Sequence, residues 1–196
     1  MRLCVFQGTF NPIHKIHLEI AKYAKEHYNF DSVLFIPAYI PPHKNIDKNL
    51  ANHRFNMVKL AISDYNYFNI SDIEYAKEEN SYTYNTVIEL YKRYEVEGKI
   101  NFLIGTDAFL KIESWYRADD LKKLLHFIVF KRTGDFEPAQ FEFLKEKDYD
   151  FEFAGMDFVD ISSTELRKNI MGGRSVSGME LPKIKEYIQR HGLYLN

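Results

Sequence analysis

Two histidines near the start of the chain, His14 and His17, are three residues apart and follow a glycine turn. The segment 8–17 reads Gly-Thr-Phe-Asn-Pro-Ile-His-Lys-Ile-His, and residues 3–6 before it are an apolar run. Residues three apart share one face of a helix, and the amino end of a helix attracts anions. The two imidazoles and the backbone N–H groups of the turn could therefore close around a polyphosphate.

The histidine pair has two other interpretations. Both side chains could be ordinary histidines in solvent or at the edge of the core, which is the commoner fate of an isolated His-x-x-His pair. They could also bind zinc, but Glu19 is the one candidate third ligand nearby. Because the pair follows a buried strand and a glycine turn, we favour phosphate binding over both.

A second anion-binding motif is predicted near the carboxyl end, where residues 162–167 read Ser-Ser-Thr-Glu-Leu-Arg. Ser162 and Glu165 have the spacing of a capping box, so a helix is expected to begin there. The same helix start presents hydroxyl and guanidinium groups that could bind a terminal phosphate. These groups belong to Ser163, Thr164 and Arg167.

Alternating apolar runs and amphipathic stretches predict the elements that position these groups. Strands are expected at residues 3–6, 32–38, 68–75, 100–104, 126–130 and 153–161, the last interrupted near Gly155. Helices are expected at residues 15–28, 51–63, 81–98, 162–171 and 181–191, with two short helices between 108 and 125. Residues 39–49 form a proline-stiffened loop, and residues 136–150 a short helix or a surface excursion.

This alternation predicts an α/β fold, a Rossmann-like doubly wound parallel sheet with a C-terminal helical segment. All 196 residues are expected to form one domain, with residues 162–196 as its helical end. Loops that follow the strands of such a sheet lie along one edge and bind ligands there. Residues 8–17, His43, residues 105–107 and residues 162–167 should therefore meet at one cleft.

Composition limits the classes of partner. Hydrophobic residues make up 45% of the chain, which supplies a buried core. The formal net charge of −2 gives no field that favours nucleic acid or an anionic membrane, so neither partner is expected. No stretch approaches the roughly 20 apolar residues of a membrane helix, and the start lacks a signal-peptide pattern. With Cys4 as the single cysteine, we expect a cytoplasmic protein without disulfides.

Six motifs follow one another along nearly the whole chain. They are residues 8–17, Pro-Pro-His-Lys at 41–44, Ser-Tyr-Thr at 81–83, Ile-Gly-Thr-Asp at 104–107, Trp-Tyr at 115–116, and Ile-Ser-Ser-Thr-Glu-Leu-Arg at 161–167. In this order the motifs resemble the nicotinate-nucleotide adenylyltransferases, which belong to the nucleotidylyltransferase superfamily of Rossmann-like folds.

The resemblance implies a reaction of ATP with nicotinate mononucleotide that gives nicotinate adenine dinucleotide and pyrophosphate in NAD biosynthesis. The residues suit direct in-line attack by the mononucleotide phosphate on the α-phosphorus of ATP. The resemblance also implies a requirement for Mg²⁺, bound mainly through the ATP phosphates. The implied catalytic residues are His14, His17 and Arg167. The implied ATP-binding residues are Gly8, Thr9, Phe10, His43, Lys44, Gly105, Asp107, Ser163 and Thr164. The implied nicotinate-mononucleotide-binding residues are Thr83, Trp115 and Tyr116, with Trp115 stacked on the ring.

Single residues in these motifs have alternative interpretations. From the residues alone, Trp115 could equally be a packing residue, and Asp107 either a helix N-cap or an acceptor for ribose hydroxyl groups. Asn11 and Ile16 stand where the commonest bacterial pattern has Asp and Gly, and they are similar to the eukaryotic branch instead. The preference between nicotinate and nicotinamide mononucleotide is therefore open, as is assembly into a homo-oligomer.

Rival functions share parts of this pattern. A phosphopantetheine adenylyltransferase or a cytidylyltransferase would have the first and last motifs, and a catalytically silent nucleotide-binding protein would keep the fold. Residues 81–83 and 115–116 argue against the first two, and retention of His14, His17 and Arg167 argues against the third.

Overall fold

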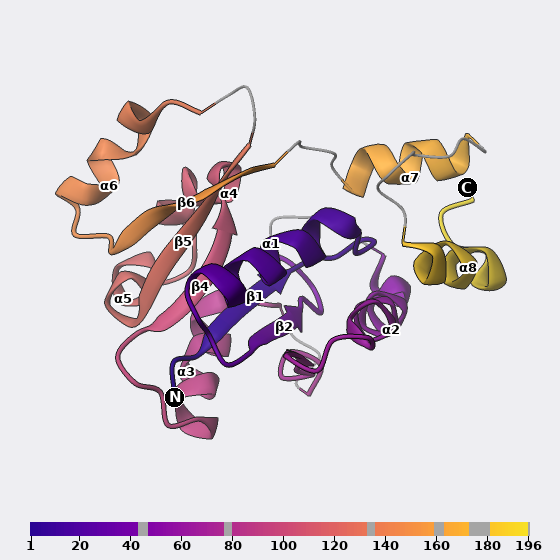
Figure 1. Ribbon diagram of the computed structural model, residues 1–196, viewed down its shortest axis with the longest axis horizontal. Helices are drawn as coiled ribbons and strands as arrows, with labels where there is room; N and C mark the ends of the chain where they lie inside the picture. Colours follow the sequence, from indigo (N-terminus) through magenta and orange to yellow (C-terminus); the bar gives the residue numbers. More distant parts are fainter. Residues whose placement is uncertain (43–46, 77–79, 133–135, 159–162, 173–180, 196) are drawn as a thin grey trace.

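The computed structural model describes residues 1–42, 47–76, 80–132, 136–158, 163–172 and 181–195. At its centre is a six-stranded parallel sheet in the order β3-β2-β1-β4-β5-β6 (Figure 1). The strands are β1 (Cys4–Gly8), β2 (Val33–Pro37), β3 (Phe68–Ile70), β4 (Ile100–Gly105), β5 (Leu125–Arg132) and β6 (Phe151–Phe158). This is the strand order of a doubly wound Rossmann sheet, so the predicted fold class is confirmed.

Helices cover both faces of the sheet. They are α1 (Lys15–His27), α2 (Ala51–Ile62), α3 (Thr83–Arg93), α4 (Thr106–Phe109), α5 (Ala118–Leu124), α6 (Glu142–Glu146), α7 (Ser163–Met171) and α8 (Pro182–His191). Single 3₁₀ turns lie at η1 (Lys48–Leu50), η2 (Ile112–Ser114) and η3 (Pro138–Phe141). Figure 1 shows α7 and α8 together at the end of the molecule opposite α6. Every helix in the described ranges is too short or too polar to span a membrane.

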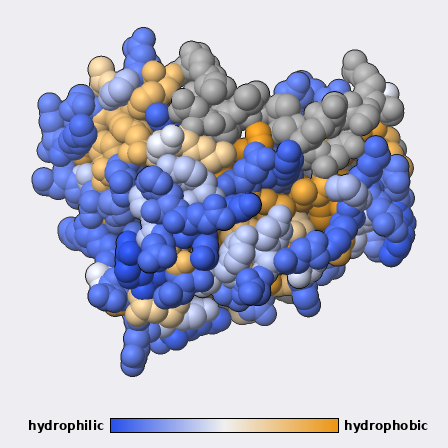
Figure 2. Space-filling view, in the orientation of Figure 1, coloured by the Kyte–Doolittle hydropathy of each residue, from blue (hydrophilic) through white to orange (hydrophobic). Residues whose placement is uncertain are grey.

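The core has two halves because successive side chains of a strand point to opposite faces. From β1, Cys4 and Phe6 pack with α1, α2 and α8, whereas Val5 packs with α3, α4 and α5. Each large apolar side chain buried in this way stabilises the fold by about 1.5–3 kcal/mol. Hydrophilic residues cover most of the outer face that Figure 2 shows.

Three element boundaries differ from the prediction. β3 ends at Ile70 rather than at residue 75, because the chain turns at Asp72, whose carbonyl accepts a hydrogen bond from the N–H of Tyr75 (2.8 Å). α3 begins at Thr83 and ends at Arg93, because the next residue is extended and Gly98 lies in the turn beyond. β6 continues through Gly155, although its pairing with β5 shifts there.

The order of the strands reverses between β1 and β4. The chain passes from β1 to β2 and β3, then returns to the other side of β1 as β4. In open α/β sheets, ligands bind in the crevice outside the carboxyl ends of the strands at such a reversal. The loop after β1, the segment after β2 and the start of α4 all lie at this edge.

Candidate active site

The loop between β1 and α1 is held by the ring of Phe10. A Cβ on Gly8 would lie 2.9 Å from Cζ of Phe10, so the ring occupies the room that a side chain would need. Phe10 has a φ of 46°, in the left-handed region that L residues seldom adopt. Its ring is buried edge-on against Phe6, with the centroids 5.4 Å apart. This packing holds the tight turn that leads into α1.

The two histidines lie side by side, as their spacing predicted. His14 is the N-cap of α1, and His17 lies in its first turn. The ring centroids are 3.8 Å apart, and Nδ1 of His17 accepts a hydrogen bond from the backbone N–H of His14 (3.2 Å). Because Nδ1 is an acceptor, the proton of the neutral His17 ring is on Nε2. The helix start therefore combines imidazole groups with the N–H groups of an anion-binding terminus.

His14 is almost fully buried, with 5% of its surface exposed. Burial lowers the pKa of His14 to about 4, because a charged imidazole loses hydration in the protein interior. In the described part of the chain, Nδ1 of His14 has no hydrogen-bond partner. The ring is therefore neutral at pH 7 in the ligand-free protein, and it can offer one N–H donor to a phosphate oxygen.

This burial makes stability fall in weak acid. The pKa of His14 is about 6.5 in the unfolded chain and about 4 in the folded one, so between these values only the unfolded state takes up the proton. Above pH 6.5 the folded protein keeps the whole of this contribution to its unfolding free energy. As the pH falls from 6.5 toward 4, the contribution is lost, and the complete loss amounts to about 3 kcal/mol. We expect His14→Gln to flatten this part of the pH dependence of the unfolding free energy, measured by urea titration. His27→Gln, at the exposed end of α1, is the matched control, and curves that fall equally in both variants would contradict the assignment.

The helix α7 brings a guanidinium group to the same loop. Nη1 of Arg167 donates to the carbonyl oxygen of Asn11 (2.7 Å), and Nη2 donates to Oγ1 of Thr164 (3.1 Å). The hydroxyl of Ser163 donates to the carbonyl oxygen of Pro12 (3.2 Å). The structure thus places the described part of the second predicted motif directly against the first.

β4 delivers Gly105 to this edge, because β4 pairs with β1. A Cβ on Gly105 would meet nothing within 4 Å, so the backbone borders open space. Gly105 is the N-cap of α4, and Asp107 is an exposed residue in the first turn of that helix. The interpretation of Asp107 as a helix N-cap is therefore wrong, and its interpretation as a ribose acceptor stays a prediction.

Of the residues predicted for the mononucleotide, Thr83 and Tyr116 lie at the start of α3, whereas Trp115 packs into the core. Thr83 is the first residue of α3, and the rings of Tyr82 and Tyr116 lie 4.9 Å apart. Tyr116 is 50% exposed, whereas Trp115 is partly buried and packs edge-on against Phe102 with centroids 6.2 Å apart. Trp115 therefore makes a core packing contact, the alternative that the sequence left open, and Tyr116 is the more accessible ring.

Arg54 is a residue of this edge that the sequence analysis missed. Its side chain is fully buried in α2. Nη1 donates to the carbonyl oxygens of Thr9 (2.9 Å) and Ala38, and Nη2 donates to that of Tyr39 (2.7 Å). Burial lowers the pKa of Arg54. One guanidinium therefore fastens the loop after β1 to the segment after β2.

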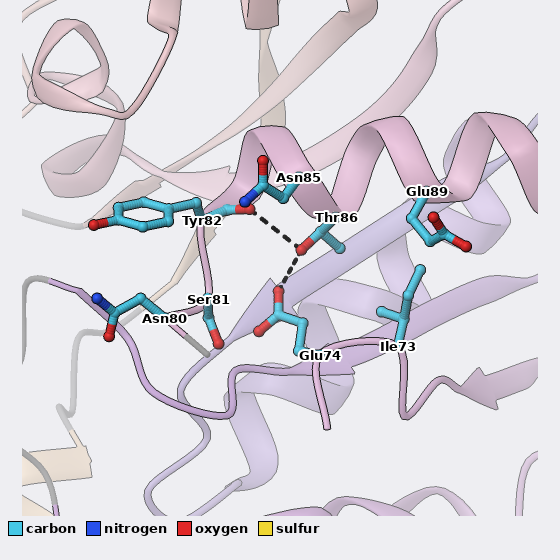
Figure 3. A pocket seen from close by; sticks show the side chains of 8 residues that line it. All are labelled: Ile73, Glu74, Asn80, Ser81, Tyr82, Asn85, Thr86 and Glu89. Carbon is cyan, nitrogen blue, oxygen red and sulfur yellow. Dashed lines mark hydrogen bonds between the residues drawn. The ribbon is translucent and has the colours of Figure 1, made fainter. Parts of the chain in front are cut away.

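The buried carboxyl group of Glu74 and the hydroxyl of Tyr194 were also missed. The carboxyl group of Glu74 is buried and accepts hydrogen bonds from the side chains of Gln7 and Thr86, the latter at 2.7 Å. Figure 3 shows Glu74 pointing toward the first turn of α3. In the loop between β1 and α1 (residues 9–14), here called the phosphate loop, Oδ1 of Asn11 accepts a hydrogen bond from the hydroxyl of Tyr194 (2.6 Å).

Some predicted residues cannot be placed. His43, Lys44 and Ser162 lie outside the described residues, so their roles stay predictions. Oε1 of Glu19, the candidate zinc ligand, lies 3.4 Å from Nζ of Lys15 and forms an ion pair with it. Within the described ranges, no group of three or more histidine, cysteine, aspartate or glutamate side chains could hold a metal ion.

Fold and site together define a class of protein: a Rossmann-type α/β protein with imidazole, guanidinium and helix N–H groups at its sheet reversal, where such folds bind ligands. Residues 5–169 match the family model described as cytidylyltransferase-like. A protein of Caldicellulosiruptor saccharolyticus, named probable nicotinate-nucleotide adenylyltransferase, is 40% identical over 198 residues, which cover 99% of each chain. A protein of Hydrogenobaculum with the same name is 38% identical over 194 residues, which cover 99% of this chain and 98% of that one. The chain belongs to the nicotinate-nucleotide adenylyltransferases of the cytidylyltransferase-like family, as the six motifs indicated.

The fold agrees with solved structures. A nicotinic acid mononucleotide adenylyltransferase of Plasmodium falciparum, complexed with NaAD, superimposes with a TM-score of 0.78. The match covers 98% of this chain and 97% of that chain at 20% sequence identity. The same Plasmodium enzyme complexed with APC gives a TM-score of 0.74 at 19% identity, with 98% and 96% covered. At such low identity the likeness concerns the fold.

Proposed function

We propose that the protein transfers the adenylyl group of ATP to nicotinate mononucleotide, giving nicotinate adenine dinucleotide and pyrophosphate. The observation that carries the proposal is the meeting of the histidine pair and α7 at the carboxyl end of β1, where Arg167 contacts the phosphate loop. The names of relatives that match over almost the entire chain support the choice of reaction. Cys4 is the single cysteine and is buried, which suits the reducing cytoplasm where we place this step of NAD biosynthesis.

In this reaction the protein must align two anions, nicotinate mononucleotide and ATP. The phosphate of nicotinate mononucleotide is already ionised, so it can attack the α-phosphorus of ATP in line without a general base, and pyrophosphate leaves. The N–H groups of His14, His17 and the first turn of α1 would donate to the phosphate oxygens as negative charge moves onto the leaving group. Arg167 carries five N–H donors, so it can bind a phosphate while it keeps its bond to Asn11.

We propose that Mg²⁺ enters with ATP, bound mainly through phosphate oxygens and water. Mg²⁺ prefers oxygen ligands and keeps several waters. The groups that line the phosphate side of the cleft are imidazoles, hydroxyls and a guanidinium, which suit the phosphates themselves. The donor set therefore fits an ion delivered on the nucleotide, and Mg²⁺ would supply additional charge neutralisation there.

The remaining predicted residues fall into two groups, one for ATP and one for the mononucleotide. Gly8, Thr9, Phe10, Gly105 and Asp107 lie at or beside the carboxyl ends of β1 and β4, where ATP would lie. The mononucleotide would lie at the start of α3, with Thr83, Tyr116 and Trp115 around the nicotinate. His43 and Lys44 would cover the phosphates. Ser163 and Thr164 would bind them from α7.

Tyr116 provides a test of the mononucleotide side. Its half-exposed ring is free of the core packing that fixes Trp115, so Tyr116→Ala should remove a substrate contact with little loss of stability. We expect the KM for nicotinate mononucleotide to rise about tenfold, while the KM for ATP stays unchanged. Tyr65→Ala, on the opposite side of the fold beside β3, is the control for loss of an aromatic ring. An equal rise in both KM values for Tyr116→Ala would contradict the assignment.

One assay of the purified wild-type protein separates the candidate functions. Pyrophosphate release is measured with ATP or CTP and with nicotinate mononucleotide, nicotinamide mononucleotide or phosphopantetheine as the acceptor. The proposal expects the highest kcat/KM with ATP and nicotinate mononucleotide. A higher value with another acceptor would assign that acceptor instead, and nucleotide binding without pyrophosphate release would support a silent nucleotide-binding protein.

A further inference from the structure

The mechanism above gives no role to the buried carboxyl group of Glu74. Only 8% of its surface is exposed. Oε1 accepts hydrogen bonds from the side-chain amide of Gln7 and from the hydroxyl of Thr86 (2.7 Å), and Oε2 accepts one from the backbone N–H of Tyr39 (3.3 Å). A carboxyl group buried without such donors would be strongly destabilising, so these bonds are what allow Glu74 to be there.

Each donor belongs to a different segment of the cleft. Gln7 is the last residue but one of β1, directly before the phosphate loop. Tyr39 follows β2, and Thr86 lies in the first turn of α3. The carboxyl group thus lies where the ATP side and the mononucleotide side of the site meet.

The peptide group of Tyr39 links this carboxyl group to the buried guanidinium of Arg54. Its carbonyl oxygen accepts from Nη2 of Arg54 (2.7 Å), while its N–H donates to Oε2 of Glu74 (3.3 Å). One peptide therefore stands between a buried guanidinium and a buried carboxyl group. Such an arrangement orients the peptide, because its carbonyl oxygen faces a donor and its N–H faces an acceptor.

The segment before α3 is tied to the same place. The N–H of Ser81 donates to the carbonyl oxygen of Ile40 (2.8 Å), and the N–H of Ile40 donates to the hydroxyl of Ser81 (3.1 Å). Ser81, Tyr82 and Glu74 line one pocket of about 40 Å³, and Figure 3 shows the side chain of Ser81 beside that of Glu74. The start of α3 borders this pocket, and the hydrogen bonds between Ser81 and Ile40 fasten it to the segment after β2.

We propose that Glu74 is a positioning residue for the mononucleotide: its carboxyl group fixes the start of α3, and with it Thr83, against the ends of β1 and β2. The inference deepens the proposed function and rests on it, since the role of Thr83 belongs to that proposal. Glu74 acts through these segments and does not touch the substrate.

The variant Glu74→Gln tests the inference. The amide keeps the size of the side chain but puts a donor NH₂ among donors, so at least one hydrogen bond is lost. We expect the KM for nicotinate mononucleotide to rise about tenfold and the KM for ATP to change by less than about twofold. Hydrogen exchange of the ligand-free variant should quicken at the amides of residues 80–86 and stay unchanged in β1 and β4.

Two sets of variants serve as controls. Glu89→Gln removes a carboxylate that lines the same cavity from its exposed side and pairs with Lys92 and Arg93, so it should match the wild type in both measurements. Thr86→Val removes the hydroxyl that donates to Glu74, so it should raise the KM for nicotinate mononucleotide as Glu74→Gln does. Thr86→Ser keeps the hydroxyl and should have the wild-type KM. If Glu74→Gln does not fold, the Thr86 pair decides the question.

The outcomes separate this inference from the proposed function. Equal rises in both KM values, or a lower melting temperature with unchanged KM values and exchange, would show a merely structural role and overturn the inference. A wild-type protein that prefers another acceptor would overturn the proposed function instead. The same KM comparison is then made with that acceptor, and the exchange measurement, which needs no ligand, still decides whether Glu74 fixes residues 80–86.

Discussion

Replacement of His17 by alanine is expected to lower kcat/KM for ATP by about a hundredfold to a thousandfold. The imidazole lies in the first turn of α1, where the helix terminus favours negative charge, and its orientation is fixed by the bond from the His14 N–H to Nδ1. The rings of Phe10 and His14 hold it from two sides, at 5.1 Å and 3.8 Å between centroids. A donor fixed before the reaction begins costs no reorganisation when charge develops on the leaving pyrophosphate.

The measurement is the steady-state release of pyrophosphate, accompanied by thermal unfolding of each variant. Loss of the acceptor for the His14 N–H should cost only about 1 kcal/mol of stability, so the His17→Ala variant should stay folded at the assay temperature. His27→Ala, at the other end of the same helix, is the matched control and should keep wild-type turnover. Unchanged pyrophosphate release by folded His17→Ala would remove His17 from the catalytic residues.

The histidine pair was predictable because its geometry is local. A spacing of three residues on a helix brings two side chains together whatever the rest of the chain does. The position of the site at the carboxyl edge of the sheet was predictable for a similar reason: strands that are buried on both faces imply a parallel sheet, and the loops at its carboxyl edge follow from that. The contact of Arg167 with Asn11 confirms that the two predicted phosphate motifs meet.

What the sequence could not supply are contacts between distant segments that bury polar groups. Glu74 lies in a stretch interpreted as part of a strand, and nothing in its neighbours indicates partners in β1 and α3. Tyr194 reaches Asn11 across 183 residues, and no local pattern predicts that bond. Such bonds depend on how the layers pack, which single-sequence periodicity does not determine.

The burial of Arg54 could have been predicted from its position in the sequence. The inward positions of α2 include Ala51, Val58 and Ala61, and Arg54 falls on the same face. An arginine within an apolar stripe must find acceptors in the interior, because a buried guanidinium without them is strongly unfavourable. Read in this way, the pattern of α2 would have indicated a buried polar contact, although not its partners.

Arg54→Met is expected to lower the free energy of unfolding by about 3–5 kcal/mol. Methionine fits the apolar stripe of α2, but it leaves the carbonyl oxygens of Thr9, Ala38 and Tyr39 without their donor. Each buried carbonyl left unpaired costs about 1–3 kcal/mol, and water that enters to satisfy it recovers part of that cost. Denaturant unfolding at pH 7 measures the change.

Two comparisons give this test its specificity. Arg54→Lys keeps the charge but places a single ammonium group where a forked guanidinium reaches three carbonyls, so it should recover only part of the stability. Arg93→Met removes an exposed arginine that pairs with Glu89, and it should cost less than about 1 kcal/mol. An Arg54→Met variant as stable as Arg93→Met would mean that the three carbonyls find other donors. The loop after β1 and the segment after β2 would then be held together by apolar packing, not by the guanidinium.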